Sequence, residues 1–149
     1  MDNFRRCGDK AAGQGDVAMS TAITRWHALL EARDTAGLHD LIADDCVFQS
    51  PAVHSPQQGK ALTIKYLSAA MQVLAQPDFH YVEEWIGERS AVLEFALTLD
   101  GISINGVDII HWNDAGQITG FRVMVRPVKG LQALMPAMVA AMAMAESSS

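Results

Sequence analysis

The first half of the chain carries apolar residues at helical spacing. Ile23, Trp26, Leu29 and Leu30 recur every three or four residues and form one apolar stripe, as expected of an amphipathic helix. The same spacing returns in two later stretches, of which the last opens at Gly59 and is broken by Gln76-Pro77-Asp78. The pattern therefore predicts three helices, over residues 20–33, 35–43 and 59–75.

After residue 78 the apolar period changes from 3.6 to 2, which is typical of β-strands. Four strands are predicted, over residues 79–87, 91–100, 102–112 and 117–126. Gly101 and the Asn113-Asp114-Ala115-Gly116 segment provide turns between them, and such short connections favour antiparallel neighbours. A shorter strand over residues 46–50 ends at Pro51 and leads into a loop over residues 51–58.

The two ends of the chain differ from this pattern. Residues 1–18 contain three glycines and little apolar periodicity, so we expect a flexible leader followed by one domain over residues 19–149. A Met- and Ala-rich helix is predicted over residues 131–145. Methionine fits irregular apolar surfaces, so this helix is expected to cover the open end of the domain or to pack on a partner subunit.

The order of elements predicts an α+β fold, with helices packed on one face of a curved antiparallel sheet. The strands place apolar residues on both sheet faces, at Val92 and Leu93, at Val107, and at Ile109 and Ile110. A sheet with one solvated face alternates more cleanly. We therefore expect a homodimer that forms through the outer sheet face.

Composition narrows the possible partners. The net charge is −6, from 17 acidic and 11 basic residues, and no Lys/Arg run interrupts it, which disfavours nucleic-acid binding. The two cysteines, Cys7 and Cys46, lack the spacing of a disulfide framework or zinc site. We find no secretory signal and no segment long and apolar enough to span a membrane. A cytoplasmic protein without a membrane partner is the expectation.

Three segments carry a family resemblance. They are Leu41 through Pro51, Gly59-Lys60-Ala61, and Gly106 through Trp112 followed by Gly116-Gln117-Ile118. Their order resembles the SnoaL-like and ketosteroid-isomerase-like domains of the nuclear-transport-factor-2-like superfamily. The resemblance covers roughly residues 20–128. It implies a cone-shaped curved sheet packed on three N-terminal helices (the cystatin-like α+β barrel), with the C-terminal helix added.

The resemblance also implies positions for a catalytic site. Ketosteroid isomerases place a general base immediately before the proline that Pro51 matches, a tyrosine on the first helix and an aspartate on the third long strand. In this chain Ser50 occupies the base position, Trp26 the tyrosine position, and the aspartate is retained as Asp108. A serine hydroxyl has no useful basicity near neutral pH, so steroid isomerisation by the family mechanism is not expected.

Asp108 is the principal candidate for chemistry. It lies in an otherwise apolar strand, and alternation places it on one face with Ile110 and Trp112. Burial disfavours the charged form of a carboxyl group, so its pKa should rise and Asp108 could serve as a neutral hydrogen-bond donor or general acid. The alternative is a structural aspartate satisfied by Trp26, Asn105 or a backbone N–H.

His54, in the loop over residues 51–58, is a weaker catalytic candidate, with an ordinary loop histidine as the alternative. His111 alternates with Asp108 and is expected on the dimer face. His27, His39 and His80 have no partners at ligand spacing, and neither a metal nor a cofactor is predicted.

Aromatic residues are expected to form the wall of an internal pocket, with Ser50 as a further polar group. The predicted pocket residues are Trp26, Phe48, Ser50, Tyr66, Trp85, Trp112 and Phe121. Two functions remain open at this level. One is a pocket for a small, mostly apolar molecule with isomerase- or cyclase-like acid–base chemistry on Asp108, and the other is a non-catalytic dimeric ligand-binding or scaffold domain.

Overall fold

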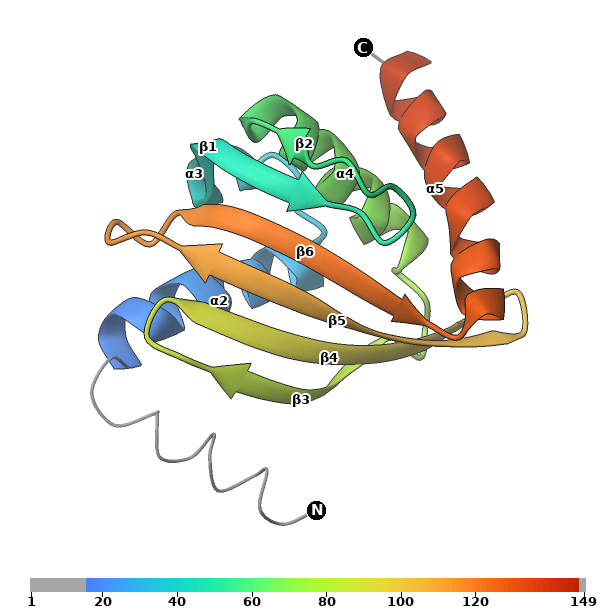
Figure 1. Cartoon of the computed structure of the whole chain (residues 1–149), viewed down its shortest axis with the longest axis horizontal. Helices are drawn as coiled ribbons and strands as arrows, with labels where there is room; N and C mark the ends of the chain where they lie inside the picture. The colour runs from blue at the N-terminus through green and yellow to red at the C-terminus, as the bar shows by residue number, and fades with distance from the viewer. Residues whose placement is uncertain (1–15, 148–149) are drawn as a thin grey trace.

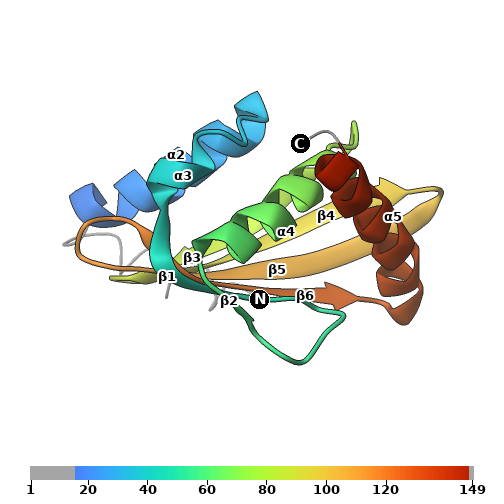
Figure 2. The same cartoon turned by 90° about the horizontal axis from the view of Figure 1, so that it is seen from above.

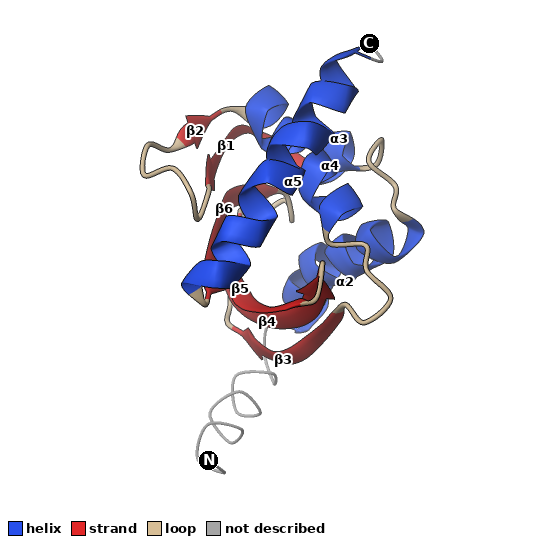
Figure 3. Ribbon diagram, turned by 90° about the vertical axis from the view of Figure 1, so that its right-hand side faces the viewer, coloured by secondary structure: helices blue, strands red, loops and turns tan. Residues whose placement is uncertain are grey.

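A computed structural model describes residues 16–147 and contains one six-stranded sheet in the order β2-β1-β6-β5-β4-β3. The sheet is curled and unclosed, and helices occupy its inner, concave side (Figure 1, Figure 3). The strands are β1 (Ile42–Gln49), β2 (Gln57–Gln58), β3 (His80–Ile86), β4 (Ser90–Leu99), β5 (Ile102–Trp112) and β6 (Ile118–Arg126). This architecture is the α+β fold that the sequence predicts.

The helices lie on the same side of the sheet (Figure 2). They are α2 (Asp16–Ala32), α3 (Leu38–Leu41), α4 (Lys60–Val73) and α5 (Val128–Ser147). Helix α2 buries Ala22, Ile23 and Trp26 against the sheet. Helix α5 follows β6 directly and packs on α4 and β5, so it crosses the open end of the curled sheet. None of the helices within residues 16–147 is long and apolar enough to cross a membrane.

Strand β5 shows the alternation that positions the site. Ile104, Gly106, Asp108, Ile110 and Trp112 are buried, whereas the residues between them are half-buried or exposed. Because successive side chains of a strand point to opposite faces, every second residue of β5 faces the helices. The predicted inward phase of Asp108, Ile110 and Trp112, and the outward phase of His111, are both observed.

Strand β3 departs from simple alternation because it contains a bulge. Tyr81 pairs with Phe95 of β4, but the next paired residue, Glu83, lies opposite Glu94, so Val82 is an extra residue. A bulge of this kind reverses the inward and outward phase of the residues that follow. Trp85 therefore pairs with Val92, a residue of the outer face.

The boundaries of several elements differ from the prediction. The short helix predicted over residues 35–43 is reduced to α3, because Ile42 and Ala43 already belong to β1. Strand β1 runs parallel to β6, a long-range pairing that adds one parallel pair to an otherwise antiparallel sheet. The loop predicted over residues 51–58 contains the two residues of β2. The predicted leader lies outside the described residues for positions 1–15, and α2 begins at Asp16.

Candidate functional site

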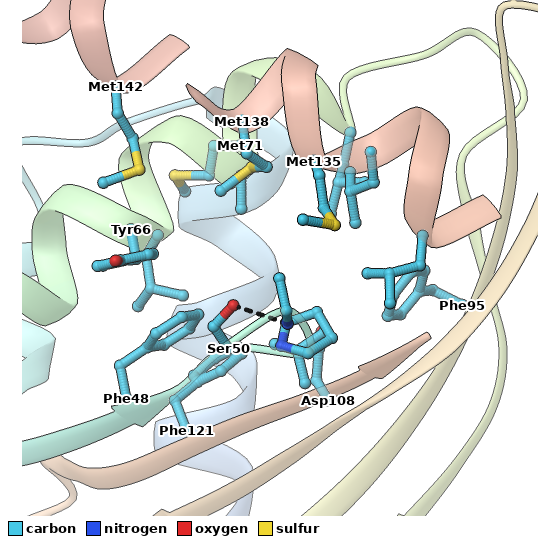
Figure 4. Close-up of a pocket in the computed structure, with 18 of the residues that line it drawn as sticks. Phe48, Ser50, Tyr66, Met71, Phe95, Asp108, Phe121, Met135, Met138 and Met142 are labelled. Carbon is cyan, nitrogen blue, oxygen red and sulfur yellow. Dashed lines mark hydrogen bonds between the residues drawn. The ribbon is translucent and has the colours of Figure 1, made fainter. Parts of the chain in front are cut away.

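A cavity of about 210 Å³ lies between the inner face of the sheet and helices α2, α4 and α5. In Figure 4, Phe48 and Phe121 of the sheet form its lower wall, and Phe95, also from the sheet, lies at its right-hand side. Methionines face them from above, and most of these belong to α5. The residues that α5 contributes are Leu131, Leu134, Met135, Met138, Val139 and Met142.

Three polar side chains from different elements meet at the wall of this cavity. The indole Nε1–H of Trp26, on α2, donates a hydrogen bond to the hydroxyl oxygen of Tyr81, on β3, at 2.9 Å. The Tyr81 hydroxyl in turn donates to Oδ2 of Asp108, on β5, also at 2.9 Å. An indole N–H is a donor only, so the Tyr81 oxygen is the acceptor of the first bond, and its O–H is free to donate to the Asp108 carboxylate.

Burial is the main cause of the raised pKa values of Asp108 and Tyr81. Asp108 is 6% exposed, and burial raises its pKa from 3.8 to about 7, while the hydrogen bond from Tyr81 acts in the opposite direction. Burial, and then the neighbouring Asp108 charge, raise the pKa of Tyr81 well above its ordinary value. Near neutral pH, Asp108 is therefore divided between its neutral and ionised forms, whereas Tyr81 stays protonated.

Tyr81 is held in place from two further sides. The imidazole of His27 contacts the Tyr81 ring edge-on, with ring centroids 5.1 Å apart, and His27 Nε2 pairs with the Glu84 carboxylate. Phe79 makes a second edge-on contact with Tyr81, at 5.4 Å. These contacts fix the ring that carries the hydroxyl, so the donor to Asp108 is pre-oriented.

Most of the predicted site residues meet at this cavity. The residues that line it are Trp26, Phe48, Ser50, Tyr66, Asp108 and Phe121. Two others are placed elsewhere, which corrects the prediction of the pocket wall. The β3 bulge turns Trp85 to the outer face, and Trp112 is buried in the core beyond the cavity, where its Nε1–H has no hydrogen-bond partner among the described residues.

The loop after β1 contributes backbone and small side chains to the cavity. Ser50 lines it, and its Oγ accepts a hydrogen bond from the backbone N–H of Ala52 at 3.1 Å, the dashed line in Figure 4. Pro51, Ala52 and Val53 also line it. His54 is exposed and is not one of the lining residues.

Tyr81 is the functional residue that the sequence analysis missed. The alternatives considered for Asp108 included Trp26, but the indole reaches Asp108 only through the Tyr81 hydroxyl. One signal was available, because Phe79 and Tyr81 share the phase of an alternating strand. The sequence does not state which side chain of β4 or β5 lies opposite Tyr81, so the contact depends on register.

The cavity chemistry is that of one carboxyl group in apolar surroundings. Asp108 is the one carboxyl-bearing residue among its lining side chains in the described part of the chain. Across residues 16–147, no group of three or more His, Cys, Asp or Glu side chains converges in a way that would hold a metal ion.

Solved structures with this fold include proteins similar in sequence. A steroid delta-isomerase from Pseudomonas aeruginosa is 35% identical, with a TM-score of 0.81 over 87% of this chain and 95% of that chain. An uncharacterised protein with a cystatin-like fold from Silicibacter pomeroyi is 30% identical, with a TM-score of 0.75 over 85% of this chain and 86% of the other. An NTF2-like protein of unknown function from Mesorhizobium loti, 22% identical with a TM-score of 0.64 over 74% of this chain and 92% of its own, shares the fold.

No match was found among curated proteins. The family model of the SnoaL-like domain matches residues 23–121. This range includes most of the sheet and the hydrogen-bonded residues Trp26, Tyr81 and Asp108. By this match and by the shared architecture, the protein belongs to the SnoaL-like domain family within the NTF2-like superfamily.

Proposed function

We propose that this protein binds a small, mostly apolar molecule in its cavity and donates a hydrogen bond from neutral Asp108 to an oxygen of that molecule. The observation that carries the proposal is a buried carboxyl group, held by Tyr81, at the wall of an otherwise apolar cavity. Ligand sites of this kind combine an apolar lining with a few fixed polar groups.

The direction of the hydrogen bonds indicates which atom of Asp108 serves the ligand. Trp26 donates to Tyr81 and Tyr81 donates to Oδ2 of Asp108, so a neutral Asp108 that keeps this bond uses Oδ2 as its acceptor. The proton of the neutral acid then resides on Oδ1, which has no hydrogen bond to a described residue. A ligand oxygen such as a ketone carbonyl would accept this proton's hydrogen bond without displacing Tyr81.

Similarity to a steroid delta-isomerase supports a ring-shaped, largely apolar ligand with a carbonyl group. Isomerisation through an enolate requires a base as well as a donor to the oxygen. Ser50 lies near the end of β1, and its Oγ accepts from the Ala52 backbone. Ser50 occupies the position of that base, and a serine hydroxyl has no useful basicity near neutral pH. We therefore propose that Asp108 binds and polarises a carbonyl group, without transfer of a proton to a second group.

The test compares ligands that differ only in the oxygen. A panel of apolar cyclic ketones and the hydrocarbons of the same shape would be titrated against the protein by calorimetry from pH 5 to pH 9. We expect the ketones to bind about tenfold tighter than the hydrocarbons near pH 6, as for one buried hydrogen bond. This preference should disappear as the pH rises through about 7, where Asp108 ionises.

Two variants of Asp108 provide the controls. Asp108→Asn retains an acceptor for Tyr81 and a donor for the ligand, so its preference for ketones should not change with pH. Asp108→Leu lacks a donor and should bind ketones and hydrocarbons alike. If wild-type protein and Asp108→Leu show the same ketone preference, oxygen recognition by Asp108 is wrong.

A further inference from the structure

A second cavity, of about 460 Å³, adjoins the first on the side of α2 and β3. The ends of α2 and α4 and the segment that leads into β3 surround it. Unlike the first cavity, it is lined by several polar side chains, those of His27, Glu31, Arg33, Gln76 and His80.

The two cavities share a wall one side chain thick. Leu30, Met71, Leu74, Phe79 and Tyr81 line both of them. The aromatic half of this wall is fixed, because Phe79 packs edge-on against Tyr81 and stacks on Phe95 at 5.9 Å. The aliphatic half, formed by Leu30, Met71 and Leu74, has no such ring contacts, and the unbranched methionine side chain can adapt to different neighbours. A ligand extending beyond the first cavity would pass here.

The charges around the second cavity are balanced. Arg33 and Glu31 are exposed at its rim with opposite charge, and His27 is paired with Glu84. His80 Nδ1 lies 2.9 Å from the Asp78 carbonyl oxygen. A carboxylate placed here would gain from Arg33 but be repelled by Glu31 and Glu84. A hydroxyl group can accept from Arg33 and donate to Glu31, so an uncharged group fits better.

We propose that the second cavity is a subsite for a hydroxyl-bearing end of the ligand whose apolar, carbonyl-bearing body occupies the first cavity. This inference rests on the proposed function and extends it. The ligand class is an elongated molecule with a carbonyl oxygen at Asp108 and a neutral polar group beyond Leu74 and Tyr81. Leu74, at the end of α4, and Arg33, at the end of α2, are the specificity-determining residues.

The experiment uses cyclohexanones with a straight chain, of increasing length, on the carbon opposite the carbonyl. The chain ends in a methyl, a hydroxyl or a carboxylate group, and affinities are measured by calorimetry at pH 6. At the length that crosses the shared wall, we expect the hydroxyl end to bind about fivefold tighter than the methyl end, as for one partly exposed hydrogen bond. The carboxylate end should show no advantage over the hydroxyl end.

Variants of residues on the shared wall and at the rim of the second cavity test where the subsite lies. Leu74→Trp should remove the advantage of the hydroxyl end by filling the passage. Leu74→Ala, which serves if the larger residue prevents folding, should preserve it. Arg33→Gln should reduce the advantage about threefold, whereas Arg89→Gln, which removes the same charge from the exposed turn between β3 and β4, should not. Leu62→Trp, at a half-exposed position of α4 outside both cavities, controls for added bulk.

The outcomes separate the two proposals. If unsubstituted cyclohexanone does not bind, or binds equally well to Asp108→Leu, the proposed function fails and the subsite fails with it. If its binding depends on Asp108 but methyl and hydroxyl ends bind alike in wild type and in Arg33→Gln, the subsite alone is overturned. If the carboxylate end binds tightest, the assignment of a neutral group is wrong.

Discussion

The two faces of the sheet carry different chemistry on the same strands. On β5, the inner face presents Asp108 and Ile110 to the cavity and core, while Val107 and Ile109 point outward and are half-buried. Helices and the cavity cover the inner face. The outer face has no covering element among residues 16–147. Strand alternation therefore places the cavity-lining Asp108 one residue away from half-buried apolar side chains of the uncovered face.

The outer face of the sheet has a polar end and an apolar end. At one end, Asn105 donates to Glu94 at 3.0 Å and accepts from Arg126 at 3.2 Å, which forms a polar network. Towards the other end lie the half-buried apolar side chains of Trp85, Val92, Val107 and Ile109. Apolar surface left open on a sheet favours association, and we propose that two copies of the chain pair through this region.

The largest expected difference between the two faces concerns packing on β6. Phe121 is 3% exposed and contacts Trp26 edge-on, with centroids 5.0 Å apart. Phe121→Ala should lower the free energy of unfolding by about 3–5 kcal/mol in urea denaturation. Met124, three residues later on the outer face, is half-exposed, so Met124→Ala should cost about 0.5 kcal/mol or less. Equal losses for the two variants would contradict the assignment of the faces.

The pH dependence of stability should also originate on the inner face. The raised pKa of Asp108 means that the folded protein binds this proton more tightly than the unfolded chain. Its stabilising contribution is complete below about pH 4 and is lost as the pH rises through 7, at about 1.4 kcal/mol per pH unit between these values. Thermal unfolding of wild type and Asp108→Asn across this range measures the difference.

Exposed Asp78 provides a control of opposite sign. The Thr98 side chain and backbone N–H lower the pKa of Asp78, so its contribution is present above its ordinary pKa and is lost as the pH falls below it. Asp78→Asn should therefore remove this contribution above the ordinary pKa of Asp78 and change the shape of the pH profile only in acid, leaving the slope between pH 4 and 7 unaltered. If Asp108→Asn leaves the profile between pH 4 and 7 unchanged, the inner-face carboxyl does not titrate as described.

Two glycines, one on each face of the sheet, extend the comparison to smaller expected changes in stability. A Cβ at Gly106, on the inner face, would lie 2.5 Å from the Phe95 ring and 2.5 Å from the Met124 carbonyl oxygen. Gly106→Ala should therefore destabilise the protein by about 1–3 kcal/mol. A Cβ at Gly120 would meet His111 at an ordinary 3.6 Å, so Gly120→Ala should be neutral or slightly stabilising in the same urea titration. The reverse ranking would contradict the packing described for Phe95.

The smallest effect on chain stability is expected on the outer face, at Ile109. Ile109→Glu introduces a charge beside Val92 that can pair with Arg122 on the neighbouring strand, and it should change the free energy of unfolding of the monomer by about 0.5 kcal/mol or less. It should nevertheless convert a dimer to a monomer in sedimentation velocity at micromolar concentration. A wild-type protein that sediments only as a monomer would refute the dimer proposal.

Sequence patterns were sufficient where a contact is local or periodic. The strand over residues 102–112 was predicted with the bounds of β5, and alternation alone placed Asp108 inward and His111 outward. The raised pKa of Asp108 followed from its apolar neighbours in the chain. The helix ends were less accurate, since Ile42 and Ala43 join β1 by pairing with β6, far along the sequence.

The fold class, the inward face of β5 and the presence of one acid among apolar residues all follow from sequence patterns. Three features depend on the packing of separate elements: Tyr81 links Trp26 to Asp108, Trp85 turns outward, and Trp112 lies outside the cavity. The physical reason is that periodicity fixes the direction of a side chain relative to its own element. Its partners depend on register, on one extra residue in β3, and on how closely separate elements approach.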